Sequence, residues 1–281
     1  MVTLTVLEKN QEQVSAALLE RHIAQAPEGA LQDGAAALKD GQYERALSIF
    51  ERLSKEAGRS FWSESGRAFA LRKLGRLEEA IRAFRGALGF DFDKEVLRMV
   101  GVTEGSLGRH NDALATFKEV IERWPDDVKV WMDRSAPLTN LARCQEADES
   151  LEKAHARRRQ LSAGDVGLLY YLGALVSLAL GVSSIQRRWL PDLEAATNTF
   201  MKWRSRARRD RQSAAFEEAV EEMKKAELSQ DDRNALEEFL LSVRLSSIRD
   251  PFKGWQALSR EISKGWPEGV SAVDAIREQR R

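Results

Sequence analysis

Apolar residues recur every three or four positions over most of the chain, and this spacing predicts amphipathic α-helices joined by short polar turns. A second pattern repeats over a longer distance, in which a small turn residue, an alanine and a large apolar residue follow one another. It occurs as Gly41…Ala46…Phe50, Gly75…Ala80…Phe84, Gly108…Ala113…Phe117 and Ala142…Ala147…Leu151. The alanines are 34, 33 and 34 residues apart, a period that indicates a stacked array of helical hairpins.

Each repeat is predicted to form two helices, A and B. In the first repeat, helix A covers residues 30–38, the turn covers 39–42 and helix B covers 43–55. The recurring alanine must be small because helix B crosses helix A there, and the large apolar residue fills the gap to the next hairpin. No hairpin buries its apolar face alone, so we expect stability to come from stacking between neighbours.

The repeats resemble the tetratricopeptide repeat family over residues 27–154. The resemblance is clearest in Leu74–Leu88 (LGRLEEAIRAFRGAL), and in WPDDVKVW, where Pro125 closes one repeat and Trp131 takes the aromatic position of the next helix A. The small residue that the family has in helix A falls on Gly34, Ala68, Gly101 and Ser135. The departures are Asp33 and Arg67 at leucine positions and Cys144 at a turn aromatic. The resemblance implies an all-α, right-handed superhelix of four to five repeats.

The same resemblance implies a binding groove on the concave surface lined by helices A. Its positions fall on Trp62, Ser65, Phe69, Arg72, Lys73, Arg98, Lys129 and Asn140. Such a surface suits an extended or helical segment that bears acidic groups. The alternative is that these are merely exposed side chains without a partner.

One function known in the family is argued against. Co-chaperone members hold a C-terminal carboxylate with lysine and asparagine from the first two helices A. Here Leu31 and Ala35 occupy the positions of that lysine and asparagine, and Gly66 occupies the second asparagine position. We therefore expect no chaperone-tail clamp.

Two segments flank the repeats. Residues 1–26 are predicted to form a capping helix for the first repeat, with Val14, Ala17 and Leu18 on one face. After the fourth repeat, residues 155–190 contain twenty uncharged residues at 166–185. This stretch is interpreted as the buried helix of a degenerate fifth hairpin, or alternatively as a membrane segment, since its length reaches that of a transmembrane helix. Arginines at both of its ends give no orientation by the positive-inside rule.

A basic stretch follows in the predicted C-terminal helical region, 191–281. Its arginines are Arg204, Arg206, Arg208, Arg209 and Arg211. They predict either a solvated helix whose charges pair with the acids of 216–228, or a patch for an anionic partner such as nucleic acid, an acidic protein or anionic lipid. Farther along, Ser229, Asp250-Pro251 and Ser271 are predicted to begin three more helices.

Composition narrows the function further. The chain has 281 residues, 44 basic and 44 acidic residues, three histidines and one cysteine. A disulfide framework is excluded, and no spacing of His and Cys predicts a metal site. No phosphate-binding loop or nucleophile motif is present, so we expect no enzyme activity, no cofactor and no small-molecule substrate. The first residues lack the pattern of a secretory signal, which favours a cytoplasmic location.

These observations predict a non-enzymatic scaffold that binds a peptide or protein on the concave surface. One alternative is a membrane-associated assembly factor anchored through 166–185. Another is a nucleic-acid-associated protein that uses 204–211.

Overall fold

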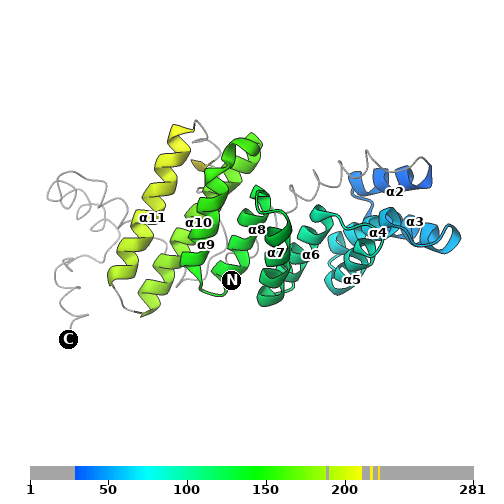
Figure 1. Ribbon diagram of the computed structural model, residues 1–281, viewed down its shortest axis with the longest axis horizontal. Coiled ribbons are helices and arrows are strands. Elements are labelled where there is room, and N and C mark those ends of the chain that lie inside the picture. Colours follow the sequence, from blue (N-terminus) through cyan, green and yellow to red (C-terminus); the bar gives the residue numbers. More distant parts are fainter. Residues whose placement is uncertain (1–28, 188–189, 211–215, 218–220, 222–281) are drawn as a thin grey trace, which may run out of the picture.

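The computed structural model describes residues 29–187, 190–210, 216, 217 and 221, and these residues form helices without any strand (Figure 1). The helices are α2 (Ala30–Lys39), α3 (Tyr43–Glu56), α4 (Phe61–Lys73), α5 (Leu77–Leu88), α6 (Lys94–Ser106), α7 (His110–Arg123), α8 (Val128–Asn140), α9 (Cys144–Ala156), α10 (Ala163–Arg187) and α11 (Leu190–Arg209), with a 3-10 turn, η1 (Arg158–Gln160), before α10. The predicted all-α solenoid is confirmed.

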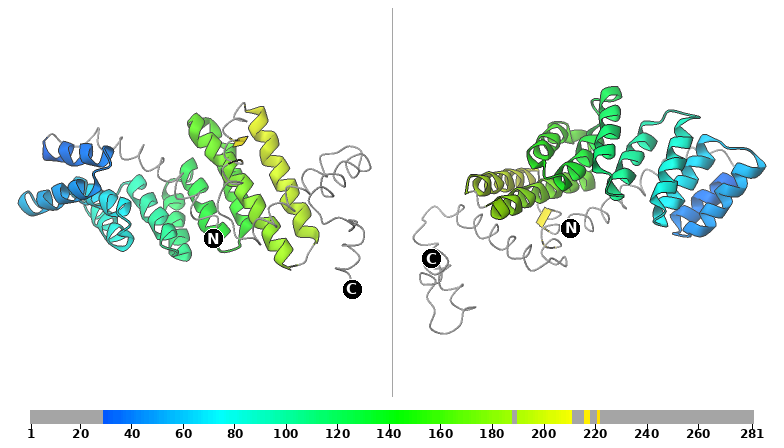
Figure 2. Two further views of the ribbon diagram at one scale, coloured as in Figure 1. Left: turned by 180° about the vertical axis from the view of Figure 1, so that it is seen from behind. Right: turned by 90° about the horizontal axis from the view of Figure 1, so that it is seen from below.

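Consecutive helices pack in antiparallel pairs, and the pairs follow one another along a row (Figure 2). The pairs are α2 with α3, α4 with α5, α6 with α7, and α8 with α9. Successive A helices also contact one another, α2 with α4, α6 with α8, and α8 with α10. We call the surface formed by these A helices the inner face.

Each hairpin interface depends on a large side chain that rests on a small residue. Phe50 of α3 lies between two glycines, and a Cβ added to Gly34 of α2 would lie 2.7 Å from its Cζ, while one added to Gly66 of α4 would lie 2.4 Å from the same ring. In α6, a Cβ on Gly101 would lie 2.6 Å from Cε1 of Phe117. Phe50 therefore joins the first hairpin to the second, as the recurring positions predict, whereas Phe117 packs the two helices of its own hairpin together.

The hairpin turns need a residue in the left-handed backbone region. Gly41, Gly75 and Gly108 have φ values of 74°, 75° and 80° at this position. In the fourth hairpin Ala142 takes the same place with φ 57°. Because the Cβ of alanine disfavours this region, the fourth turn carries strain that the glycine turns avoid.

The apolar segment forms most of α10, which packs against α8, α9 and α11. Leu169, Tyr170 and Ala174 are fully buried there. A Cβ on Gly173 would lie 2.3 Å from the indole of Trp203 in α11, so this pair repeats the small-on-large contact of the earlier hairpins. Helices α10 and α11 are thus a fifth hairpin, and α11 lies within the region that the sequence assigned to 191–281.

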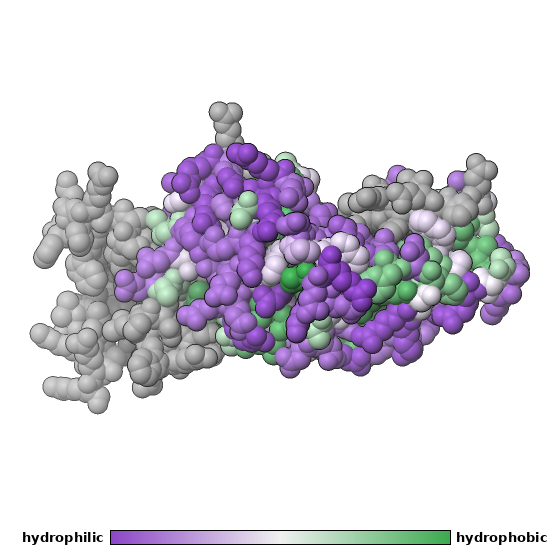
Figure 3. All heavy atoms as spheres, in the orientation of Figure 1, coloured by the Kyte–Doolittle hydropathy of each residue, from purple (hydrophilic) through white to green (hydrophobic). Residues whose placement is uncertain are grey.

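Among the described residues, α10 is also the one helix long and apolar enough to cross a membrane. Its window at 163–182 has a mean hydropathy of 1.7, and 67% of that window is buried by the rest of the chain. The surface over α9, α10 and α11 is mostly hydrophilic, whereas hydrophobic side chains gather over α4 to α6 on the face shown in Figure 3. The predicted cap in 1–26 and the helices after 229 lie outside the described residues.

We predict that Gly101→Ala destabilises the chain by about 1–3 kcal/mol, because the new methyl group meets the ring of Phe117. Gly105→Ala on the same helix is the matched control, since its Cβ would have only one neighbour, at 3.9 Å. The control should gain about 0.5–1 kcal/mol from helix propensity. Urea midpoints followed by circular dichroism measure both. Equal shifts for the two variants would contradict the packing described above.

Candidate functional site

On α4, the predicted groove positions share one helix face but differ in exposure. Ser65 is buried and its hydroxyl donates to the carbonyl of Trp62 at 3.2 Å. Phe69 is buried and packs edge-to-face on Phe84, with ring centroids 5.1 Å apart. Trp62, Arg72 and Lys73 are half-buried. Ser65 and Phe69 therefore serve the packing of the hairpin, and the other three are the partly exposed groove positions of α4.

Arg98 of α6 is an internal residue in this structure. Its side chain is 1% exposed, and its guanidinium donates to Asp133 of α8 and, at 3.1 Å, to Glu95 of α6. Burial lowers the pKa of Arg98, but the charges of Asp133 and Glu95 outweigh it, so the pKa lies above its ordinary value. The cation thus joins α6 to α8, and we leave Arg98 out of the proposed contact surface.

Lys129 and Asn140 lie at opposite ends of α8 and are half-buried. They are one hairpin away from the groove residues of α4, because hairpin α6–α7 stands between. Lys129 lines a cavity instead, and its ammonium lies 3.7 Å from a carboxylate oxygen of Asp165. The predicted groove residues thus fall into two groups rather than one.

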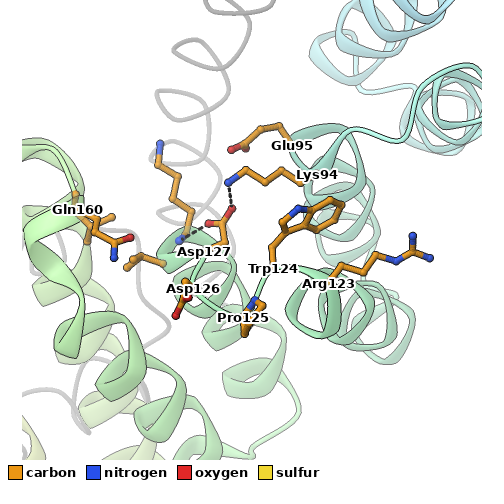
Figure 4. Close-up of a pocket in the computed structure, with 11 residues that line it drawn as sticks. Lys94, Glu95, Arg123, Trp124, Pro125, Asp126, Asp127 and Gln160 are labelled. Carbon is orange, nitrogen blue, oxygen red and sulfur yellow. Dashed lines mark hydrogen bonds and ion pairs between the residues drawn. The ribbon is translucent and has the colours of Figure 1, made fainter.

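The cavity has a volume of about 560 Å³ and lies where hairpins three, four and five meet (Figure 4). It is lined by the start of α6, the loop between α7 and α8, the start of α8, and the residues just before α10. The lining residues include Lys94, Glu95, Arg123, Trp124, Asp127 and Gln160. In Figure 4, the indole of Trp124 stands between Lys94 and Arg123.

Asp127 organises the mouth of this cavity. One of its oxygens accepts from the backbone N–H of Lys129 at 3.0 Å and thereby caps α8, and the other lies 2.8 Å from the ammonium of Lys94. Burial raises the pKa of Asp127, but the hydrogen bond and charge of Lys94, followed by Arg98 and the backbone donor, hold it below its ordinary value. The carboxylate is therefore ionised near neutral pH and its acceptors are occupied.

Arg206 of the basic stretch, and Lys202 just before it, pair with acidic residues of α9. Lys202 lies 2.5 Å from Asp148 and 2.9 Å from Glu152, and Arg206 lies 2.7 Å from Glu152. Both acids belong to α9. The acids of 216–228 that the sequence predicts as partners lie, apart from Glu217 and Glu221, outside the described residues, so that pairing stays a prediction. Sequence reasoning missed the contact of α11 with α9 because about fifty residues separate the two helices. The sequence does offer one sign of this contact: Asp148 and Glu152 are four residues apart and therefore lie on one face of α9, where they can pair with a basic helix.

The remaining arginines of the stretch keep their charge at the surface. Arg208 and Arg209 are exposed, and Arg204 is half-buried. Arg211 lies outside the described residues. Nearby, Asp210 accepts from Arg158 at 2.5 Å and from the hydroxyl of Tyr170, so the end of α11 is fixed to η1 and α10.

His155 lies inside this junction, between the rings of Tyr170 and Trp203 at centroid distances of 6.0 and 5.7 Å. Burial, followed by the charges of Arg206 and Arg158, lowers its pKa to about 4, and the opposing charges of Glu152 and Asp210 offset only part of this shift. His155 is therefore neutral at pH 7. In the described part of the chain, no group of three or more His, Cys, Asp or Glu could hold a metal ion.

Comparison with known proteins supports the repeat fold. A tetratricopeptide repeat model matches residues 66–94. The solved structure of MamA, from residue 41 to its end, of Desulfovibrio magneticus RS-1 is similar over 69% of this chain and 96% of that one, with 14% identity and a TM-score of 0.51. YrrB, described as a TPR protein with an unusual peptide-binding site, is similar over 66% and 93%, with 15% identity and a TM-score of 0.44. A search of curated protein sequences finds no match.

The buried pair of α6 and α8 gives a stability prediction. Asp133→Ala leaves the buried guanidinium of Arg98 without its main partner and should cost about 3–5 kcal/mol. Asp126→Ala is the control, because its pair with Arg157 is exposed and should cost about 0–1 kcal/mol. The measurement is the urea midpoint. Arg98→Met combined with Asp133→Leu should recover most of the loss, and a failure to recover it would mean that the charges are not the cause.

His155 gives a pH prediction. Its pKa is lower in the folded chain than the ordinary value near 6.5, so the unfolded chain binds the proton more tightly. Stability should therefore fall as the pH is lowered from about 6.5 toward about 4, by about 1–3 kcal/mol from this residue. His155→Phe keeps a ring against Trp203 and should show a smaller loss between pH 7 and pH 5. Identical pH profiles for the variant and the wild type would rule out this role.

Proposed function

Because the chain is a tetratricopeptide repeat protein, we propose that it is a non-enzymatic scaffold that binds a peptide or protein segment on its inner face, in the cytoplasm. The observation that carries the proposal is the side-chain arrangement on α4. Trp62 lies near the beginning of that helix, Arg72 and Lys73 lie at its end, and all three are half-buried.

The distance between these groups defines the ligand class. Ten residues of α-helix separate Trp62 from Arg72, which corresponds to about 15 Å. An extended segment covers this length with about five residues. A partner with an apolar side chain at one end and an acidic side chain at the other fits the indole and the two cations together.

The indole is also held in place before any partner arrives. Its ring meets Phe61 edge-to-face at a centroid distance of 5.2 Å, and Phe61 itself is buried. A fixed aromatic side chain loses little conformational entropy when a ligand packs on it. Trp62 is therefore suited to act as the anchor of the site.

The two alternative functions have less support. Insertion of 166–185 into a membrane would require the apolar side chains of α10 to leave their contacts with α8, α9 and α11. Binding of nucleic acid by the basic stretch would compete with the pairs that Lys202 and Arg206 make with Asp148 and Glu152. Both contacts favour a structural role for these segments.

We expect Trp62→Ala combined with Arg72→Glu to abolish capture of the main partner when the full chain is used as bait in extracts of its own cells. The indole contact is lost and the charge at the end of α4 is reversed. Arg82→Glu is the matched control, since Arg82 is exposed on helix B of the same hairpin. Quantitative mass spectrometry of the captured proteins and circular dichroism of each variant are the measurements.

The proposal fails if the double variant remains folded and captures the same proteins in the same amounts. In that case the binding surface lies elsewhere on the chain. If Arg82→Glu also lost the captured proteins, the loss would follow from the change in net charge and not from the groove residues.

A further inference from the structure

Phe90 and Phe92 are the two large hydrophobic side chains that the described part of the chain exposes, at 54% and 40%. Both lie in the loop between α5 and α6, away from the residues of α4 discussed above. Scattered exposed apolar residues are ordinary, but two that lie next to an organised aromatic cluster mark an interaction surface.

The cluster is built across two hairpins. The ring of Phe92 stacks on Trp124 with centroids 6.0 Å apart and planes 17° from parallel. The guanidinium carbon of Arg123 lies 4.1 Å from the centroid of the same ring. Arg123 also forms an exposed ion pair with Glu119 at 3.0 Å, and its cation–π contact adds to the stacking on Trp124 that orients the ring. Phe92 is thus exposed and yet fixed, as an anchor residue for binding must be.

The surface continues into the cavity of Figure 4, because Arg123 and Trp124 belong to both. The volume of about 560 Å³ lies within the range of about 300–1,000 Å³ of ligand sites in proteins. A bulky side chain of a partner could enter beside Trp124 while its neighbours cover Phe90 and Phe92. We call Phe90, Phe92, Trp124 and the adjoining cavity the aromatic edge.

The charges around this edge select the partner. Lys94 pairs with Asp127, Glu95 with Arg98, and Asp126 with Arg157, so these groups are compensated within the chain. Asp91, between the two phenylalanines, is exposed and makes no ion pair with the other described residues. An acidic segment would be repelled there, and a basic residue would be attracted.

We propose that the aromatic edge is a second docking surface, which takes a partner segment that has an aromatic or large aliphatic anchor next to a lysine or arginine. The anchor packs against Phe92 and Trp124, and the basic residue pairs with Asp91. This class of ligand is opposite in charge to the one proposed for the inner face. The two surfaces can therefore be occupied by different partners at once.

The test uses three dipeptides whose blocked termini carry no charge: N-acetyl-Trp-Arg-amide, N-acetyl-Trp-Gln-amide and N-acetyl-Trp-Glu-amide. Each is titrated into the full chain, and binding is followed by NMR. Shifts are expected in the backbone amides of 90–92 and in the indole N–H of Trp124, with dissociation constants in the millimolar range. The arginine peptide should bind about two- to fivefold more tightly than the glutamine peptide, which is the size of an exposed ion pair. The glutamate peptide should be the weakest.

Variants of the chain show which residues are responsible for the binding of the peptides and for its dependence on charge. Phe92→Ser should remove binding of all three peptides, and Asp91→Asn should bring the arginine peptide to the affinity of the glutamine peptide. Lys118→Ala, exposed on α7, is the control and should change nothing. Trp62→Ala with Arg72→Glu should also leave these shifts intact, so failure of the inner-face proposal is distinguishable from failure of this one.

The proposal is overturned if no shifts appear at 90–92 and Trp124, or if the three peptides bind equally and Asp91→Asn has no effect. It is also overturned if ultracentrifugation shows a dimer of the full chain that dissociates in Phe92→Ser, since a second copy would then be the occupant.

Discussion

A large side chain of one helix rests on a small residue of the helix beside it, and the solenoid depends on this contact. Phe50 lies on Gly34 and Gly66, Phe117 lies on Gly101, and Trp203 lies on Gly173. Because the ring occupies the space of a missing Cβ, the helices approach closely and their order is fixed. The contacts on Gly34, Gly101 and Gly173 join the two helices of one hairpin, and the contact of Phe50 with Gly66 joins the first hairpin to the second, so that neighbouring hairpins stack.

This contact also explains what the sequence could and could not predict. The four hairpins follow from residues that repeat at 33 or 34 positions, and even the turn at Ala142 was placed by that period although it lacks glycine. The fifth hairpin keeps the contact between a glycine and a large ring, but the two residues are farther apart in the sequence. Trp203 follows Gly173 by thirty residues, whereas Phe117 follows Gly101 by sixteen. A search for a fixed period does not detect such a contact, so the sequence does not predict the pairing of α11 with α10.

The groove residues show a second limit of sequence reasoning. Arg72 and Arg98 both occupy inner-face positions of helix A, so the repeat pattern gives them the same role. In the structure Arg98 is buried because Asp133, on the next helix A, supplies a carboxylate. The pairs between α9 and α11 likewise join residues that are 50 or more positions apart. Whether a charge is available for binding depends on its partner in space, and that partner follows from packing rather than from local pattern.

Internal pairing therefore decides how the chain presents its charge. The formal net charge is zero, and among the described residues some ion pairs lie within one helix, as with Glu64 beside Arg67, while others join neighbouring hairpins, as with Glu104 beside Arg85. At the two candidate surfaces, Arg72 and Lys73 lie at the end of α4 and Asp91 lies in the loop before α6. The two proposed surfaces each combine an aromatic anchor with charged side chains, basic on one surface and acidic on the other, and this difference in charge is how a row of hairpins would distinguish two ligands without any change in its fold.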